Sequence, residues 1–244
     1  MASQTKIEWT EFSWNPVTGC TKVSAGCKNC YAERMAKRLQ LMGVKRYHDG
    51  FGITLHEDLI NAPLMWKKPR RIFVNSMSDL FHEQVPLEFI QRVFVTMSKC
   101  PQHTFQILTK RSKRLLELSP KLTWPDNVWM GVTVEDSNVI DRIFDLAGVP
   151  AAIHFLSCEP LIGPLNYLPL ENIQWVIVGG ESGPGARLMR KEWVETVYIQ
   201  CRKAGVPFFF KQWGGTRKNK TGRLLDNRVY DEMPSLMYQP SFVA

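Results

Sequence analysis

Short apolar runs recur along the chain and dominate its pattern of hydrophobic and polar positions. They are rich in β-branched and aromatic residues, and each ends in a polar or glycine-rich turn. Runs of this length and composition predict buried β-strands. The predicted strands span residues 71–75, 104–109, 128–134, 153–157, 175–178 and 207–211.

Helical periodicity fills the segments between these runs. In residues 87–97, apolar side chains recur at i, i+3, i+4 and i+7, and Pro86 opens the segment. Residues 191–204 form a clear helical pattern that Gly205 terminates. Shorter helices are predicted over residues 112–118 and 138–147.

Near-continuous apolar strands that alternate with helices favour a parallel sheet covered by helices on its outer face. One further strand, at about residues 14–18, brings the pattern to about seven β/α units. We therefore predict an α/β fold, a partial or nearly closed parallel (β/α) barrel of about six or seven units. It forms a single domain over residues 1–244, with 215–244 as a C-terminal extension. A doubly wound open sheet is the alternative, because strand order cannot be derived from the sequence.

Polar and ionisable residues follow nearly every predicted strand. In such folds the active site collects at the carboxyl ends of the strands. In an alternative interpretation, some of these residues cap the next helix instead of forming a site. Asp79, Asp136 and Ser182 are the candidates for such caps. The residues at these ends are Cys20, Ser76, Met77, Ser78, Asp79, Lys110, Arg111, Glu135, Asp136, Cys158, Glu159, Gly179, Gly180, Glu181, Ser182, Lys211, Gln212 and Trp213.

Composition places the chain among ordinary globular proteins, with 44% hydrophobic and 22% charged residues. No apolar run is long enough to cross a bilayer and the N-terminus is no signal peptide, so we expect a cytoplasmic protein without a membrane partner. The formal net charge of +8 favours anionic partners, nucleic acid first, and charge that serves solubility alone is the alternative. The basic residues cluster at 67–71, 110–114 and 217–223.

Three of the six cysteines lie within eleven residues, as Cys20-x6-Cys27-x2-Cys30. In a reducing compartment a cluster this tight indicates a metal site before it indicates disulfides. Three local thiolates favour a [4Fe–4S] cluster with one open iron. A structural zinc ion, with His48 or Cys158 as fourth ligand, is the alternative, and redox thiols are a weaker one. A helical pattern begins at Tyr31, and the amide groups of its first turn would stabilise thiolates.

Several blocks of sequence resemble one known family. They are residues 14–20, 27–31, 73–81, 108–111, 131–135, 157–160, 178–183 and 210–213, and the resemblance covers most of the chain, from residue 7 to about 215. This set is similar to a phage and bacterial three-Cys-motif family, usually described as radical S-adenosylmethionine (SAM)-like. Any one block is weak, but the whole set is specific.

The resemblance implies a partial barrel that binds a [4Fe–4S] cluster through Cys20, Cys27 and Cys30, with SAM on the fourth iron. An external electron donor would reduce the cluster, and SAM would be cleaved to a 5′-deoxyadenosyl radical. The chain departs from the commonest superfamily spacing, C-x3-C-x2-C, because its first gap is six residues. In the superfamily an aromatic residue often precedes the last cysteine. Here Asn29 occupies that position, and the aromatic residue, Tyr31, comes directly after Cys30 instead.

The expected cofactor-binding residues sit at other strand ends. The resemblance to the wider superfamily implies that Ser76, Ser78 and Asp79 bind SAM, because they occupy the place where that superfamily usually has a glycine-rich acidic motif. Glu135 and Glu181 are further cofactor-binding candidates, and Glu181 is also a candidate for the substrate.

Two lysines and one cysteine are the catalytic candidates. Lys110 and Lys211 would clamp a carboxylate or phosphate, unless they form ion pairs with glutamates across the mouth. Cys158 would donate a hydrogen atom or hold a substrate, and its alternative is a small buried apolar side chain.

The sequence thus predicts a radical SAM enzyme that modifies or repairs a nucleic acid or nucleotide, with DNA, RNA or a nucleotide as substrate. The alternative is a non-catalytic nucleic-acid-binding protein with a structural zinc or iron–sulfur site. A phage-related protein that acts with a partner chain is a third interpretation.

Overall fold

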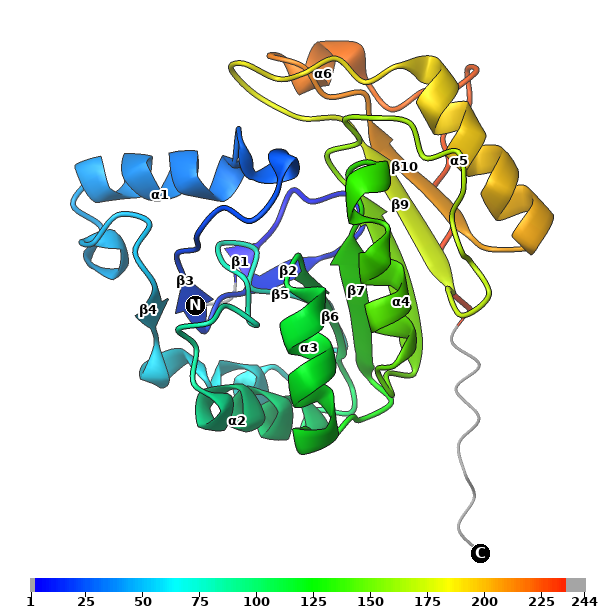
Figure 1. The fold of residues 1–244 in the computed structure, drawn as a ribbon. Coiled ribbons are helices and arrows are strands. Elements are labelled where there is room, and N and C mark those ends of the chain that lie inside the picture. Colours follow the sequence, from blue (N-terminus) through cyan, green and yellow to red (C-terminus); the bar gives the residue numbers. More distant parts are fainter. Residues whose placement is uncertain (1–2, 236–244) are drawn as a thin grey trace, which may run out of the picture.

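The computed structural model describes residues 3–235 and shows a sheet that curls into a half barrel (Figure 1). The strand order is β1-β2-β5-β6-β7-β8-β9-β10, and the last seven strands in this order are parallel. β1 pairs with β2 in the antiparallel direction, and a separate antiparallel pair joins β3 to β4. The strands are β1 (Ser3–Gln4), β2 (Phe12–Trp14), β3 (Val17–Thr18), β4 (Thr54–Leu55), β5 (Arg71–Val74), β6 (Thr104–Thr109), β7 (Val128–Thr133), β8 (Ile153–Cys158), β9 (Trp175–Gly179) and β10 (Phe208–Gln212).

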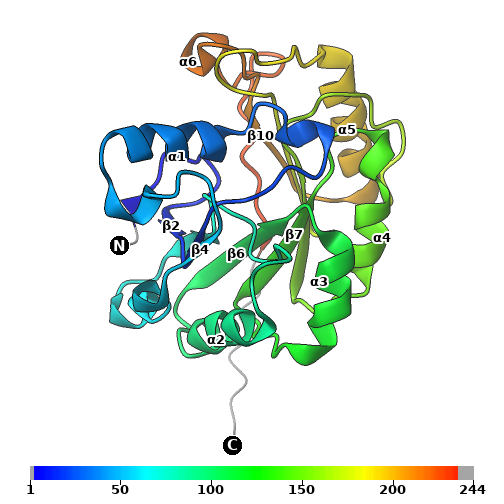
Figure 2. The ribbon, with the colours of Figure 1, turned by 60° about the vertical axis from the view of Figure 1, so that its left-hand side comes forward.

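Four helices cover the outer, convex face of this sheet (Figures 1 and 2). They are α2 (Leu87–Ser98), α3 (Ser112–Leu118), α4 (Asp141–Ala147) and α5 (Lys191–Ala204). Their apolar sides pack on the strands and form the main core, because each helix carries the periodic apolar stripe seen in the sequence. Gly205 ends α5 with a φ of 66°, a left-handed conformation that glycine adopts without steric penalty.

The concave face is filled low in the barrel by an aromatic cluster. Its buried members are Trp9, Trp129, Phe155, Trp175, Ile177 and Phe209. Trp175 lies at the centre of this cluster. Its ring contacts the rings of the four other aromatic members at centroid distances of 5.7–6.2 Å. The lower part of the barrel is therefore a packed core, so a ligand has to approach from the carboxyl ends of the strands, the mouth.

The predicted partial barrel is confirmed, and the doubly wound alternative is wrong. The parallel strands follow one another across the sheet in chain order, with no point where the order reverses. One detail differs, because the strand predicted over residues 14–18 is split. β2 ends at Trp14, and Pro16, which has no N–H to donate to a ladder, separates it from β3.

Two further helices lie at the mouth rather than on the sheet. α1 (Tyr31–Leu41) runs along the upper edge of the barrel, and α6 (Lys218–Thr221) follows β10 on the same side (Figures 1 and 2). Among residues 3–235, no helix is both long and apolar enough to span a membrane. Short 3-10 helices occur at Ala25–Cys27, Lys45–Tyr47, Glu57–Leu59, Ala62–Met65, Ser119–Lys121 and Ser137–Val139, and the last of these replaces the start of the helix predicted at 138–147.

The predicted C-terminal extension returns along the last strand. Asp231 forms a β-bridge with Phe209 of β10, and the Trp175 indole donates a hydrogen bond to the Glu232 carbonyl at 2.8 Å. Residues 236–244 of the extension lie outside the described residues.

Candidate functional site

The cysteine loop lies at the mouth of the half barrel. It begins after β3, where Gly19 bridges to Ser78 beyond β5, and it ends where α1 starts at Tyr31. Cys20, Cys27 and Cys30 are half-buried free thiols. The loop contacts the ends of three separate strands, and each contact braces a different part of it.

Arg111, after β6, braces the start of the loop. Its Nη1 lies 3.6 Å from Cys20 Sγ, and its Nη2 donates to Thr21 O at 3.2 Å and Thr21 Oγ1 at 2.8 Å. Glu83 accepts from Arg111 Nε at 2.9 Å, and Asp79 lies 3.5 Å from Nη1. The guanidinium therefore has its donors directed at the loop and at two carboxylates that balance its charge.

Glu135, after β7, braces the middle of the loop. Its Oε1 accepts a hydrogen bond from Ser24 Oγ at 2.6 Å, and its Oε2 accepts from Arg142 Nη1 at 2.8 Å. A Cβ on Gly26 would lie 2.4 Å from Glu135 Oε1, so only glycine fits at this position of the loop. Glu135 is 1% exposed, which makes this contact part of the protein interior.

Glu181, after β9, braces the end of the loop. Asn29 Nδ2 donates to Glu181 Oε2 at 2.9 Å, and also to the Gly185 carbonyl at 2.8 Å. Arg187 donates to both Glu181 oxygens, at 3.0 Å from Nε and 2.6 Å from Nη2. Asn29, the residue before the last cysteine of the loop, thus has a defined structural partner.

α1 is tied to the same strand end. Arg34 Nη2 donates to the Ser182 carbonyl at 2.6 Å, and its Nη1 donates to the Pro184 carbonyl at 3.1 Å. The helix that follows the cysteines is therefore held beside the loop after β9, across the mouth from the strand that precedes the cysteines.

Three cysteine thiols on one loop are a donor set that an iron–sulfur cluster can take. Among residues 3–235, no three His, Cys, Asp or Glu side chains converge closely enough to hold one metal ion. Ligands of a cluster bind different iron atoms, so they need not converge as the ligands of one zinc ion do. Cys20, Cys27 and Cys30 are free thiols on one braced loop, so their chemistry and number fit such a cluster.

Electrostatics differ along the loop. Burial and the Asp79 carboxylate raise the pKa of the Cys20 thiol to about 11, although Arg111 acts in the opposite direction. Burial alone would raise the pKa of Glu181, but the hydrogen bonds from Arg187 and Asn29 outweigh it and hold that pKa at about 2.

The low pKa of Glu181 predicts a loss of stability in acid. Its unfolded-state pKa is about 4.3, so its contribution is complete above about pH 5 and is lost as the pH falls towards 2. The difference in unfolding free energy between wild type and Glu181→Gln should shrink by roughly 3 kcal/mol from pH 6 to pH 2, about half of it by pH 3. Urea unfolding at several pH values measures this, and a pH-independent difference would contradict it.

The predicted SAM-binding serines are engaged within the protein. Ser76 Oγ donates to Asn15 Oδ1 at 3.2 Å, and Ser78 Oγ donates to the Val17 carbonyl at 2.8 Å. Both contacts tie the loop after β5 to the segment that leads into the cysteines.

Asp79 is engaged even more completely. Its Oδ1 accepts from Phe81 N at 3.0 Å and from Thr109 Oγ1 at 2.7 Å. Its Oδ2 accepts from Lys110 N at 3.1 Å and lies 3.5 Å from Arg111 Nη1. At 6% exposure, the carboxylate is a buried junction between the ends of β5 and β6.

Both lysine candidates form the ion pairs that the sequence offered as their alternative. Lys110 Nζ lies 3.8 Å from Glu135 Oε1, and Lys211 Nζ donates to Glu159 Oε2 at 3.0 Å. The lysine side chains are 21% and 18% exposed, so they line the mouth without projecting into solvent.

Cys158 does not join this set. It is fully buried and belongs to the core cluster between the sheet and the outer helices, together with Cys201 of α5. Burial raises the pKa of the Cys158 thiol well above its ordinary value. Its placement favours the interpretation as a small buried apolar side chain, because the preceding residue of β8 takes the concave face.

Sequence reasoning missed the hydroxyl pair Thr133 and Ser157. They are register partners on β7 and β8. Thr133 shares the concave face with Trp129, four positions earlier on β7, and Ser157 shares it with Phe155, two positions earlier on β8. Within the described chain, Thr133 Oγ1, Ser157 Oγ and Glu159 Oε1 are buried and have no hydrogen-bond partner. The two-residue alternation of the strands was the signal that could have identified them.

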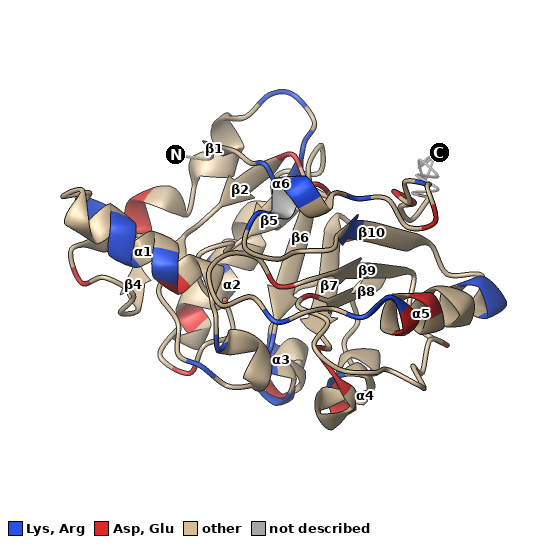
Figure 3. Cartoon of the chain, turned by 90° about the horizontal axis from the view of Figure 1, so that it is seen from above, with Lys and Arg blue, Asp and Glu red and all other residues tan. Residues whose placement is uncertain are grey.

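Cations gather on the side of the mouth. Seen from this side, lysine and arginine residues lie along α1 (Figure 3). Lys28 and Arg38 are exposed, next to the last two cysteines and on α1 respectively. The basic cluster at 67–71 lies instead at the amino end of β5, at the opposite end of the sheet, where Arg70 stacks on Phe12 and Arg71 pairs with Glu11.

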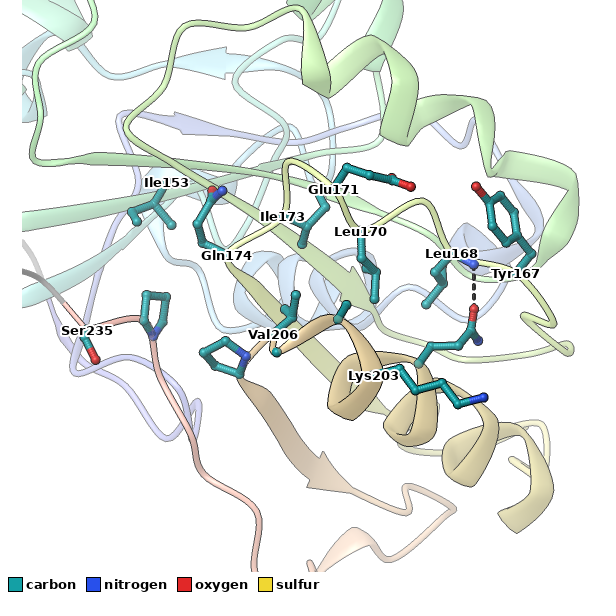
Figure 4. Close-up of a pocket in the computed structure, with 15 residues that line it drawn as sticks. Ile153, Tyr167, Leu168, Leu170, Glu171, Ile173, Gln174, Lys203, Val206 and Ser235 are labelled. Atoms are coloured by element: carbon teal, nitrogen blue, oxygen red, sulfur yellow. Dashed lines mark hydrogen bonds between the residues drawn. The ribbon is translucent and has the colours of Figure 1, made fainter.

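A groove of about 750 Å³ opens far from the cysteine loop (Figure 4). Ile153 and Pro207, at the amino ends of β8 and β10, line it together with Leu170 and Val206. It therefore lies at the opposite end of the barrel and is no part of the candidate site.

The fold is similar to solved structures of spore photoproduct lyase. A point mutant of that enzyme gives a TM-score of 0.54 at 10% identity, over 87% of this chain and 79% of that chain. A structure complexed with dinucleoside spore photoproduct gives 0.47 at 12% identity, and a double mutant with bound AdoMet and the same compound gives 0.46 at 11%. In both of these cases the match covers 83% of this chain and 64% of that chain.

Identities this low establish a common fold and nothing more. The likeness and the strand order together confirm the predicted fold class, an α/β partial parallel (β/α) barrel. No curated protein sequence matches the chain. A family model described as "Protein of unknown function (DUF5131)" matches residues 4–234, and the chain therefore belongs to the DUF5131 family.

Proposed function

We propose that this protein is a radical SAM enzyme that acts on a nucleic acid or nucleotide. The observation that carries the proposal is the placement of three free thiols, Cys20, Cys27 and Cys30, on one loop at the mouth of a parallel half barrel. The braces from three strand ends support it, since they keep the loop at the place where active sites form in this fold class.

The three cysteines would hold a [4Fe–4S] cluster and leave one iron open for SAM. When bound, such a cluster supplies the electron that cleaves SAM to methionine and a 5′-deoxyadenosyl radical. The chain's own contribution is to present the thiolates, to exclude water with the aromatic cluster below, and to orient SAM. The likeness to a lyase of the same fold agrees with an enzyme, and the mechanism itself remains our proposal.

Polar groups on the concave face would orient the bound molecules. The unpaired atoms of Thr133, Ser157 and Glu159 are acceptors or donors that a ligand entering from the mouth could satisfy. Lys211, paired with Glu159, would offer a positive charge to a carboxylate or phosphate at the same place.

The substrate class rests on charge. The net charge is +8, and exposed cations such as Lys28 and Arg38 stand beside the cysteine loop and on α1 (Figure 3). A phosphodiester backbone is the polyanion that such a surface attracts most strongly.

Anaerobic reconstitution with iron and sulfide tests the proposal. The protein should turn brown, bind about four irons per chain, and produce 5′-deoxyadenosine from SAM when a chemical reductant serves as external electron donor. Stoichiometric zinc without a chromophore and without SAM cleavage would contradict it, and would support a binding protein with a structural metal.

A further inference from the structure

We propose that Glu135 is a positioning residue that acts through Ser24 to fix Cys27 within the cysteine loop. This inference rests on the proposed function, because it assigns the loop to a cluster. It gives Glu135 a role other than the direct SAM contact expected from the sequence.

The contacts form a continuous chain from the barrel to a cysteine. Arg142 Nη1 donates to the Thr133 carbonyl at 2.7 Å and to Glu135 Oε2 at 2.8 Å. Glu135 Oε1 accepts from Ser24 Oγ at 2.6 Å, and Ser24 Oγ lies 3.9 Å from Cys27 Sγ. The strand end of β7 is thereby linked to the second of the three thiols, and the part of this link from Glu135 to Cys27 consists of side chains.

Burial keeps this chain of contacts in one arrangement. Glu135 is 1% exposed and Arg142 is 8% exposed, so water does not compete for the carboxylate. Gly26 packs directly against the Glu135 side chain, where a Cβ would come within 2.4 Å of Oε1. The carboxylate therefore serves at once as hydrogen-bond acceptor for Ser24 and as a packing surface for the next turn of the loop.

The unusual length of the first cysteine gap explains the need for such a brace. Six residues separate Cys20 from Cys27, and they include Ser24, Ala25 and Gly26. An arm of this length and composition loses much conformational freedom when its thiol is fixed. A brace at Ser24 divides the arm into shorter segments, so the loop is largely ordered before any metal binds.

The role is indirect, which distinguishes it from ligation or catalysis. Both Glu135 oxygens already have partners among the described residues, and the hydrogen-bonded route from Glu135 to the cysteine passes through the Ser24 hydroxyl. Removal of that hydroxyl should therefore reproduce the effect of altering Glu135 on the loop, while the buried pair with Arg142 stays intact.

Ser24→Ala in the full-length apo protein is the principal test. Amide hydrogen exchange at Cys27 and Lys28 reports on the turn, because these groups donate to Ser24 O at 3.0 Å and Ala25 O at 3.2 Å. Loss of a hydrogen bond to a charged acceptor should accelerate their exchange about tenfold. Ser24→Thr, which keeps the hydroxyl, should exchange like wild type, and so should Ser137→Ala, an exposed serine near Glu135.

Glu135→Gln is a second variant. If it folds, hydrogen exchange at the Cys27 and Lys28 amides should be faster in it than in wild type. Unchanged exchange in Ser24→Ala would overturn the inference whatever the folding of Glu135→Gln. In reconstituted Ser24→Ala, the electron paramagnetic resonance spectrum of the reduced cluster should broaden relative to wild type and Ser24→Thr. If wild type holds no cluster, the proposed function fails, and the exchange measurement on the apo protein still decides whether the brace exists.

Discussion

Replacing Cys27 with alanine is expected to abolish both the iron–sulfur chromophore and the production of 5′-deoxyadenosine. Two thiolates cannot hold three corners of the cluster, and the remaining cysteines of the chain are buried in the core. Loss of the cluster removes the source of the electron for SAM cleavage, so turnover should fall by at least about a thousandfold, to the background of the assay. Iron and sulfide analysis, the visible spectrum and product chromatography measure these changes.

Cys100→Ala is the matched control for this experiment. Cys100 is 1% exposed and lies between α2 and β6, in the core cluster and away from the loop. Its removal should leave iron content and SAM cleavage unchanged, at a small cost in stability. A Cys27→Ala protein with full iron content and full activity would refute the assignment of the cysteine loop, and equal losses in both variants would mean that the assay reports on folding.

Replacing Asp79 with alanine is expected to lower the free energy of unfolding by about 3–5 kcal/mol. The carboxylate receives hydrogen bonds from Phe81 N, Thr109 Oγ1 and Lys110 N, and it faces the Arg111 guanidinium at 3.5 Å. Its removal leaves buried donors unpaired and reduces the charge that balances Arg111. In a chain of this size the melting temperature should fall by about 10 °C or more.

Urea unfolding of Asp79→Ala beside Ser76→Ala gives the comparison. Ser76 makes one side-chain hydrogen bond at 3.2 Å, to Asn15, and its loss should cost about 1 kcal/mol. The result also separates two roles for Asp79. Wild-type stability combined with weaker SAM binding would show that Asp79 serves the cofactor, as the sequence suggested, and would contradict its role as a buried junction.

The braces give a common explanation for the two departures from the usual superfamily pattern. The longer first gap is compensated by contacts of its residues with Arg111 and Glu135. Asn29, in the place of an aromatic residue, donates to Glu181. In this interpretation, contacts with the ends of β6, β7 and β9 restrict the conformation of the cysteine loop. A shorter loop would be restricted by its length alone.

Much of the secondary structure follows from local pattern. The strand at 104–109 and the helices at 112–118 and 191–204 were predicted with the bounds that the structure shows. These segments have an unbroken apolar period and, in the last case, a glycine stop, so local energetics and tertiary packing favour the same structure. The prediction of one continuous strand over residues 14–18 was wrong, because a single proline interrupts the hydrogen-bond ladder there.

The sequence by itself determined the order of strands and helices, the side of the barrel on which polar residues collect, and the candidate thiols. Only the tertiary structure decided which of these residues meet. Ser24 and Glu135 are 111 residues apart, and Asn29 and Glu181 are 152 apart. Side-chain partners at such separations depend on how far the sheet curls and how each strand end is registered, and no local period encodes either quantity. Cys158 lies at the carboxyl end of its strand, as the sequence predicted. Its side chain nevertheless points into the core on the outer face of the sheet, because successive residues of a strand face opposite sides.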